Sequence, residues 1–257
     1  MLAIERRKRI EDIINKEKSV LVVELAKMFE VTTETIRGDL EKLEKQGVLV
    51  RTYGGATLVE GSDADMDYAA RATVNAEGKQ RIGERAAEMI KDGETIFLDA
   101  STSSFYVAKS IKNKKGITVI TNAERVITEL AGLDNIKVIC VGGLLRPKNM
   151  SFIGRIAEDT IKKSYYANKL FFSCRGATIL RGLTESNEEE AEIKKAMLER
   201  SETSIFLCDH KKIGKLGVPI VSDLKSIDTI ITDTKLTEEW KTVLADNDVD
   251  VIEVLKK

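Results

Sequence analysis

The chain has 257 residues, 42% of them hydrophobic and 32% charged, and its formal net charge is -1 at pH 7, so any nucleic-acid surface must be local. This balance is typical of a globular protein with enough apolar material for one large domain, or for a small and a larger one. No apolar run approaches the roughly 20 residues of a membrane helix, and the charged N-terminus lacks the apolar core of a signal peptide, so we expect a cytoplasmic protein without a membrane partner.

The first 57 residues are predicted to form a small winged helix-turn-helix domain. Ile10, Ile13 and Ile14 lie at helical spacing and predict a first helix. A β-like run from Ser19 to Val22 follows it. The segment VELAKMF then places Val23, Leu25, Ala26 and Phe29 for a short second helix.

A third helix is predicted from Thr32 to Lys45. Thr32 suits its start, because a threonine hydroxyl can accept a hydrogen bond from an unpaired amide of the first turn. Ile36, Leu40 and Leu43 recur at helical spacing and form one buried face. The opposite face of this helix is therefore free to meet a partner.

The third helix, the strand and turn that follow it and the basic first helix are together typical of a DNA-binding domain. The second helix of a helix-turn-helix enters the major groove, where its first residues reach base edges. A strand and a Gly-Gly turn after the helix favour a wing, and basic residues in the first helix suit phosphates. A helical module that binds another protein is the alternative. The residues expected to contact DNA are Arg6, Thr33, Thr35, Arg37, Gly38, Arg51, Tyr53 and Gly54.

The run VTTETIRGDLEKLEKQGVLVRTYGGA, residues 31–56, resembles the DNA-binding signature of the DeoR family of transcription regulators. That signature contains Thr-Ile-Arg, Asp-Leu, Leu-Glu, a glycine, and a wing of Arg-x-His/Tyr-Gly-Gly-Ala. The chain departs from it at Gly38, where the family usually has a basic residue, and at Tyr53, where histidine is commoner. The resemblance implies a regulator that binds double-stranded operator DNA.

Residues 58–75 lose the helical periodicity, and the acidic stretch VEGSDADMD predicts a linker. From residue 76 onwards, helical segments alternate with the apolar strands TIFLD, ITVIT, IKVICV, KLFFSC, SIFLC, DTIITD and DVDVIEVL. This alternation predicts an α/β domain over residues 76–257, with a mostly parallel sheet covered by helices on both faces.

The side chains that most often bind metals are sparse. His210 is the single histidine, which excludes a site with several histidine ligands. Cys140, Cys174 and Cys208 lie far apart in the sequence, each in an apolar run typical of a strand. We therefore expect three reduced, buried thiols, no metal site and no cofactor.

Small polar residues follow three of the predicted strands. The first of them, TIFLD, leads into a serine- and threonine-rich turn before a helix, where hydroxyls and unpaired amides suit a phosphate. An ordinary capped helix start is the alternative. Ligands of parallel sheets bind at such strand ends. The residues expected to contact a ligand there are Asp99, Ser101, Thr102, Ser103, Thr121, Asn122, Gly142 and Gly143.

Charged residues after later strands would complete an anion site. Arg175 follows LFFSC, Lys212 follows SIFLC, and Glu185 precedes a predicted helix. The blocks LDASTSS, VITN, VGGLLR, SFIG, LFFSCRG and LCDHKKIG resemble the sensor domain of the DeoR family. The resemblance implies a fold similar to ribose-5-phosphate isomerase, and ligand roles for the strand-end residues and Lys212 toward a phosphorylated sugar or polyol derivative.

Two functions are weighed. The favoured one is a transcription regulator, usually a repressor, of sugar or polyol metabolism, controlled by a phosphorylated sugar and without catalytic residues. The alternative is a sugar-phosphate isomerase-like enzyme, for which Asp99, Glu185 and Asp209 offer carboxylates. An isomerase has no use for the first 57 residues, whereas a regulator needs both parts. We expect a homo-oligomer, a dimer or tetramer, whose paired winged helices bind a repeated DNA sequence.

Overall fold

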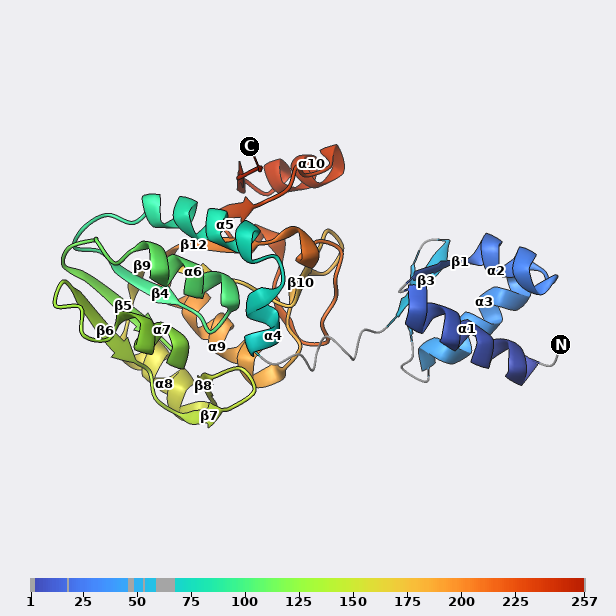
Figure 1. The fold of residues 1–257 in the computed structure, drawn as a ribbon, viewed down its shortest axis with the longest axis horizontal. Coiled ribbons are helices and arrows are strands. Elements are labelled where there is room, and N and C mark those ends of the chain that lie inside the picture. Colours follow the sequence, from blue (N-terminus) through green and yellow to red (C-terminus); the bar gives the residue numbers. More distant parts are fainter. Residues whose placement is uncertain (1–2, 18, 46–48, 53, 59–67, 257) are drawn as a thin grey trace. The chain divides into compact units, whose positions relative to one another are not determined.

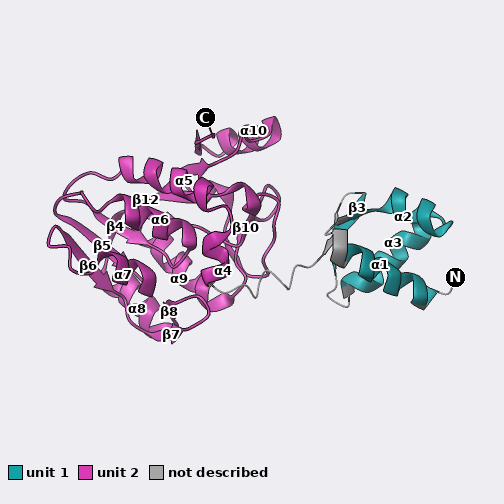
Figure 2. Ribbon diagram, in the orientation of Figure 1, with its two compact units in different colours: residues 1–65 teal, residues 66–257 magenta. Residues whose placement is uncertain are grey.

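The computed structural model describes residues 3–17, 19–45, 49–52, 54–58 and 68–256. The chain divides into two compact units, residues 1–65 and 66–257, shown in separate colours in Figure 2. Each unit has its own hydrophobic core. The predicted winged helix-turn-helix segment lies within the first unit.

The first unit is built from three helices and a small antiparallel sheet with strand order β1-β3-β2 (Figure 1). Ile36 and Leu40 are fully buried, as their spacing predicts, and Thr32 caps the third helix by accepting a hydrogen bond from the amide of Thr35 at 3.2 Å. Gly47, predicted to end the third helix, and Tyr53, predicted to lie in the turn of the wing, are outside the described residues. The elements are α1 (Ala3–Glu17), β1 (Ser19–Leu21), α2 (Val22–Phe29), α3 (Thr33–Lys45), β2 (Leu49–Thr52) and β3 (Gly55–Leu58).

The second unit is centred on a seven-stranded sheet with the order β15-β14-β12-β9-β4-β5-β6. All neighbouring strands in it are parallel. The seven strands coincide with the seven apolar runs that the sequence predicts, so this fold-class prediction is confirmed. They are β4 (Thr95–Leu98), β5 (Ile117–Thr121), β6 (Ile136–Cys140), β9 (Ala167–Phe172), β12 (Ser201–Cys208), β14 (Thr229–Thr232) and β15 (Asp250–Glu253).

Helices cover both faces of this sheet. Strand side chains alternate between the faces, so Ile96 and Leu98 pack in one core while Phe97 packs in the other. The first core is closed by α5 (Ala76–Glu88), α6 (Thr102–Ser110) and α7 (Glu124–Leu130). The second core is closed by α8 (Arg155–Ser164), α9 (Glu188–Glu199) and α10 (Glu238–Asp246).

Several small elements escape prediction from the sequence, because a strand of three residues carries too little periodicity. A two-stranded antiparallel hairpin and a three-stranded sheet in the order β10-β11-β13 lie outside the main sheet. These elements are β7 (Leu144–Arg146), β8 (Ser151–Ile153), β10 (Gly176–Thr178), β11 (Gly182–Thr184), β13 (Ile220–Ser222), and the short 3-10 helices η1 (His210–Lys212) and η2 (Leu224–Ser226).

The linker predicted for residues 58–75 is wrong in its second half. Residues 68–73 form a helix, α4 (Tyr68–Thr73), while residues 59–67 lie outside the described part. The ring of Tyr68 is buried and packs edge-on against Phe105 of α6, and its amide donates to the carbonyl of Lys148 at 3.0 Å. Tertiary contacts therefore hold a helix that is too short to show periodicity.

The three cysteines are free thiols. Cys174 and Cys208 are buried as expected, but the prediction is wrong for Cys140, which is exposed. It ends β6, an edge strand of the sheet, where no further strand covers it. Among the described residues, no helix combines the length and apolar character needed to cross a membrane.

Candidate functional site

The exposed side of α3 carries the predicted DNA contacts. The side chain of Arg37 is 58% exposed and pairs with Glu34 at 3.2 Å, one turn earlier. A Cβ added at Gly38 would meet no atom within 4 Å, so packing inside the unit does not require this glycine. Thr33 is exposed, whereas the hydroxyl of Thr35 lies 2.9 Å from that of Thr32 and belongs to the helix start. The outer face of α3 therefore presents Arg37 near its N-terminal end and an open backbone at Gly38.

The wing of this unit is described in part. Arg51 on β2 is 43% exposed in its side chain, and its Nε donates to Glu44 at 2.9 Å. Gly54 is exposed and has a φ of 85°, a conformation that favours glycine. The predicted contact Tyr53 lies outside the described residues.

Arg6 is not available as a DNA contact, so that prediction is wrong. The residue is 7% exposed, and its Nε lies 2.6 Å from the Asp39 carboxylate on α3. Arg7 pairs with the other oxygen of Asp39 at 3.2 Å. Part of the basic charge in the first helix therefore fixes α1 to α3 instead of facing solvent, and the sequence alone did not show this use.

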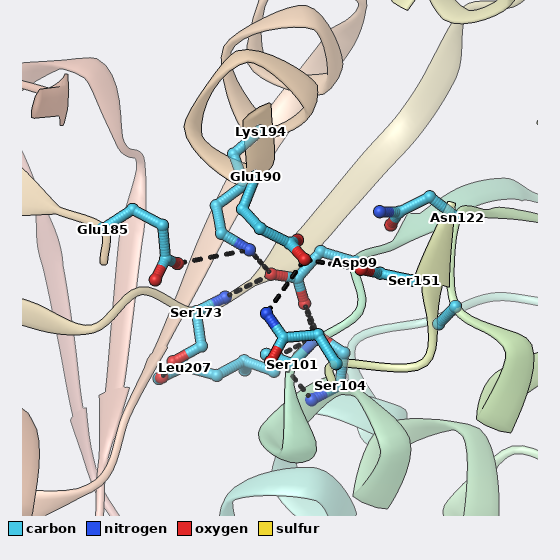
Figure 3. Close-up of polar contacts among 12 residues, drawn as sticks. Asp99, Ser101, Ser104, Asn122, Ser151, Ser173, Glu185, Glu190, Lys194 and Leu207 are labelled. Carbon is cyan, nitrogen blue, oxygen red and sulfur yellow. Dashed lines mark hydrogen bonds and ion pairs between the residues drawn. The ribbon is translucent and has the colours of Figure 1, made fainter. Parts of the chain in front are cut away.

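In the second unit, Asp99 lies at the centre of a buried polar group at the carboxyl end of β4 (Figure 3). One of its oxygens accepts from the amide of Ser101 at 3.1 Å and from the hydroxyl of Ser104 at 2.5 Å. The other accepts from the amide of Ser173 at 3.2 Å and from Lys194 at 2.7 Å. Because Asp99 is fully buried with both oxygens engaged, it positions its neighbours and does not face a ligand.

Lys194 on α9 completes this buried group. Its amine also lies 3.6 Å from Glu185. Burial alone lowers the pKa of Lys194, but the charges of Asp99, Glu185 and Glu190 outweigh burial and raise it above the usual range. Burial raises the pKa of the Asp99 carboxyl, but the charge and hydrogen bond of Lys194 dominate and lower it. Lys194 and Asp99 are therefore both charged at neutral pH.

For Glu190 and Lys194 the sequence favours a solvated surface, but the structure buries both. Both lie on the buried face of α9, beside Ile193 and Met197. A lysine and a glutamate four residues apart within an apolar helical stripe are a detectable signal, since unpaired charges are almost never fully buried. That signal predicts buried partners, which the structure identifies as Asp99 and its neighbours.

The serine-rich turn after β4 combines the two predicted uses. Ser101 is the N-cap of α6, and its hydroxyl accepts from the amide of Ser104 at 3.1 Å, which is the capped turn weighed as the alternative. The hydroxyl of Ser103 differs, because it is buried and has no hydrogen-bond partner in the described chain. Thr102 is 2% exposed and begins α6. Ser103 is therefore one hydroxyl of this turn that the described chain leaves without a hydrogen bond.

At the ends of β5 and β6, some polar groups are used within the fold and others are left without a hydrogen-bond partner. The hydroxyl of Thr121 donates to the carbonyl of Leu98 at 2.6 Å and so ties β5 to β4. The amide nitrogen of Asn122 donates to the carbonyl of Phe152, but its Oδ1 is buried without a partner in the described chain. Gly143 has a φ of 110°, and a Cβ there would lie 2.6 Å from a backbone oxygen of β8, so this turn requires glycine.

Two lysines lie beside this buried group. Lys212 on η1 donates to the hydroxyl of Ser173 at 2.6 Å, and its amine is 4.0 Å from Asp209. Lys79 on α5, which the sequence did not single out, donates to the backbone carbonyls of Arg71 and Val74. Burial and the positive charge of Lys212 lower the pKa of Lys79 to about 8. The two positive charges repel each other, and an anion near both lysines would relieve this repulsion.

The predicted effector residues are thus partly brought together. The buried group around Asp99 gathers the ends of β4, β5 and β9 with α9, and Lys212 joins it through Ser173. The predicted contact Arg175 is half-buried directly after Cys174 at the end of β9, and Gly142 has a φ of 71° after β6. These placements fit one site at the carboxyl edge of the sheet.

Comparison with known proteins covers both units. Residues 6–61 match the model of the DeoR-like helix-turn-helix domain, and residues 74–234 match that of the DeoR C terminal sensor domain. The chain is 39% identical over 254 residues to an uncharacterized HTH-type transcriptional regulator, YulB, of Bacillus subtilis, covering 99% of this chain and 98% of that protein.

Two further relatives carry names with a stated role. A putative aga operon transcriptional repressor of Escherichia coli O157:H7 is 30% identical, covering 96% of this chain and 93% of that protein. An L-fucose operon activator of Haemophilus influenzae is 33% identical, covering 92% and 94%. Among solved structures, a D-ribose-5-phosphate isomerase in complex with phospho-erythronic acid is similar at 14% identity and a TM-score of 0.40, over 54% of each chain.

Proposed function

The chain belongs to the DeoR family of transcription regulators, and from this premise we propose that it represses genes of sugar or polyol metabolism under the control of a phosphorylated sugar. The observation that carries the effector half is the pair of lysines, Lys79 and Lys212, which act on each other electrostatically, with Lys212 bound to Ser173 of the group around Asp99. A relative named as a putative repressor supports repression, and a relative named as an activator is the alternative.

The proposed operator contacts lie on α3 and the wing. The N-terminal end of α3 presents Thr33, Arg37 and Gly38 without a packing duty inside the unit. The absence of a side chain at Gly38 lets a phosphate or base edge approach the helix backbone closely. We retain Arg51 and Gly54 as wing contacts and leave out Arg6, which is bound to Asp39.

Arg37→Ala is expected to weaken operator binding by about 1–3 kcal/mol, the range for a good contact between arginine and a base. Its ion pair with Glu34 is exposed, so stability should change little. A gel-shift or fluorescence-anisotropy titration at fixed salt measures the effect. Arg85→Ala is the matched control, since Arg85 forms the same kind of exposed pair with Glu88 in the other unit. Equal operator affinity in the two variants contradicts α3 as the recognition helix.

The effector's phosphate is proposed to bind between the two lysines and the start of α6. Lys79 makes hydrogen bonds only to backbone carbonyls among the described residues, and the nearby Lys212 repels its charge. A dianionic phosphate would remove this repulsion and form charge-assisted hydrogen bonds, which are about twice as strong as neutral ones. The unpartnered hydroxyl of Ser103 and the first amides of α6 would add donors.

Lys212→Met is expected to lower the affinity for a phosphorylated sugar by about 10–100-fold, the loss of one hydrogen bond to a charged group. Isothermal titration with paired free and phosphorylated sugars measures it, and the free sugars should bind far more weakly to the unaltered chain. Lys211→Met is the control, because Lys211 is the exposed neighbour on the same short helix. A free sugar that binds as tightly as its phosphate contradicts the phosphate site.

An isomerase-like enzyme is the less favoured reading of the same residues. A general base must reach the substrate, yet Asp99 is fully buried and bound to Lys194. Glu185 is held by its own serine neighbour and by Lys194, and Asp209 is 2% exposed and accepts from the amide of Lys211. The three carboxylates therefore hold neighbouring residues in place through hydrogen bonds and ion pairs, which supports a binding site without catalysis.

We further propose that the chain acts as a homo-oligomer, a dimer or tetramer. One winged helix binds only a short stretch of DNA. Two linked winged helices that bind a repeated sequence together have a higher overall affinity than either one alone. An effector that favours one arrangement of the pair changes operator affinity by its differential binding, typically about 1–3 kcal/mol.

A further inference from the structure

A second polar group lies beside the proposed phosphate position, around the β7–β8 hairpin. Its centre is Glu190 of α9, which is 3% exposed. One Glu190 oxygen accepts from the hydroxyl of Ser151 at 2.5 Å and from the amide nitrogen of Asn149 at 2.9 Å. Arg146 of β7 brings its guanidinium to 3.7 Å from the same oxygen. The proposed phosphate contacts use none of these side chains.

Two atoms of this group are buried without a hydrogen-bond partner in the described chain. They are Oδ1 of Asn122 and Nη1 of Arg146. The orientation of the Asn122 amide is fixed, because its nitrogen donates to the carbonyl of Phe152 at 3.1 Å, so the unpartnered atom is an acceptor. Nη1 of Arg146 is a donor, and it is the atom that lies 3.7 Å from Glu190, too far for a hydrogen bond. Such groups are rarely left unpaired in folded proteins, and a bound ligand is one explanation.

The fold places these atoms on neighbouring segments. Arg146 and Ser151 are partners in the register of the β7–β8 hairpin. Ala123, the residue after Asn122, bridges to Ser151, and the amide of Phe152 donates to the carbonyl of Asn122 at 2.7 Å. Figure 3 shows Asn122 and Ser151 on the side of Asp99 opposite Glu185, with Glu190 reaching from α9 toward Ser151. The group is therefore a distinct part of the same strand-end site.

An unpartnered acceptor and a donor without a hydrogen bond, on neighbouring segments, suit a hydroxyl, which donates one hydrogen bond and accepts others. A second anion fits less well, since Glu190 already balances the charge of Arg146 and would repel it. We propose that Asn122, Arg146 and Glu190 form a subsite that recognises the hydroxyls of the effector's carbon chain and so selects which sugar phosphate is bound. This inference rests on the proposed function and adds specificity to it.

The test compares selectivity in the full chain with and without the subsite. Probes for isothermal titration are inorganic phosphate and a panel of hexose and pentose phosphates that includes stereoisomers and a deoxy analogue. Asn122→Ala and Arg146→Met remove one unpartnered atom each from different elements. Arg155→Met is the control, because it makes the same replacement at a side chain that is 92% exposed.

The unaltered chain and Arg155→Met are expected to separate the best from the worst sugar phosphate by at least about 100-fold, since sites that bind hydroxyls strongly reject analogues lacking them. Asn122→Ala and Arg146→Met should compress that range to below about 10-fold. Their affinity for inorganic phosphate should stay within about threefold of the unaltered chain, which also shows that the site is folded. If one variant fails to fold, the other carries the comparison.

The outcomes separate this inference from the proposed function. Variants that keep the ranking and range of the unaltered chain contradict the subsite alone. Variants that lose inorganic phosphate as strongly as sugar phosphates contradict it too, because the groups would then serve the phosphate. An unaltered chain that binds no phosphorylated compound contradicts the proposed function, and the subsite with it.

Discussion

Lys194→Met is expected to lower the free energy of unfolding of the second unit by about 3–5 kcal/mol, the usual result of removing one partner from a buried ion pair. Methionine fills a similar volume, so the loss comes from charge and not from a cavity. The Asp99 carboxylate would stay fully buried with its strongest partner gone, 2.7 Å from where the amine was. Glu185 and Glu190 would add repulsion to the uncompensated charge.

The neighbouring residue supplies the control for this experiment. Lys195 pairs with Glu192 at 2.8 Å, but both side chains are 37% exposed, so Lys195→Met should cost at most about 1 kcal/mol. Urea unfolding of the full chain, followed by circular dichroism, measures both variants. Adding Asp99→Asn to Lys194→Met should recover part of the loss, because the buried charge disappears. Equal stability of the two lysine variants contradicts this account of the site.

The same pair gives a pH dependence with a definite sign. The pKa of the Asp99 carboxyl is lowered, so its contribution is present above the unfolded value of about 3.9 and is lost as the pH falls through the folded value. The pKa of Lys194 is raised, so its contribution is present below about 10.4 and is lost only as the pH rises above that. The stability difference between the unaltered chain and Lys194→Met should therefore be fullest between these limits and should shrink toward acid.

Asp39→Ala is expected to destabilise the first unit by about 3 kcal/mol or more, and so to abolish operator binding. Asp39 is 3% exposed and accepts ion pairs from Arg6 at 2.6 Å and from Arg7 at 3.2 Å. Alanine leaves Arg6 buried without a counter-charge. A unit of about 60 residues has little stability to spare, so a loss of this size leaves much of it unfolded.

A control variant distinguishes loss of operator binding through unfolding from loss through a removed DNA contact. Glu34→Ala removes an acid of the same helix whose side chain is 82% exposed, so it should change stability by at most about 0.5 kcal/mol. Asp39→Ala should lower the melting temperature of the first unit in a thermal unfolding experiment. The melting temperature of the second unit and its ligand binding should not change. A folded Asp39→Ala that binds operator normally would contradict the role of this ion pair.

Asp39 also gives a physical reason for part of the TIRGDL run. Arg37 and Gly38 face outward, while Ile36 and Leu40 face the core. Asp39 lies between these faces and joins α3 to α1. One helical turn therefore carries packing, anchoring and the proposed DNA contacts, because the 3.6-residue period sends neighbouring residues to different sides.

The sequence by itself determined the framework of this protein. Seven apolar runs predicted the seven strands, and residues at helical spacing predicted the buried faces of α1 and α3, because periodic apolar residues act over a few neighbours along the chain. The prediction for α2 holds at Leu25, Ala26 and Phe29 but is wrong at Val23, which is 69% exposed. It also indicated that the strand ends carry the site, since parallel strands bring their carboxyl ends to one edge. Short elements such as α4 and the β7–β8 hairpin escaped it.

Only the tertiary structure decided which polar side chains are committed and which remain available. Asp99, Ser101 and Thr121 looked like ligand contacts from their positions, yet their partners come from within the fold, up to 95 residues away for Lys194. Arg6 looked like a phosphate contact, yet Asp39 holds it. Hydrogen bonds and ion pairs between distant segments depend on the packing of whole elements, and no local pattern in the sequence encodes that packing.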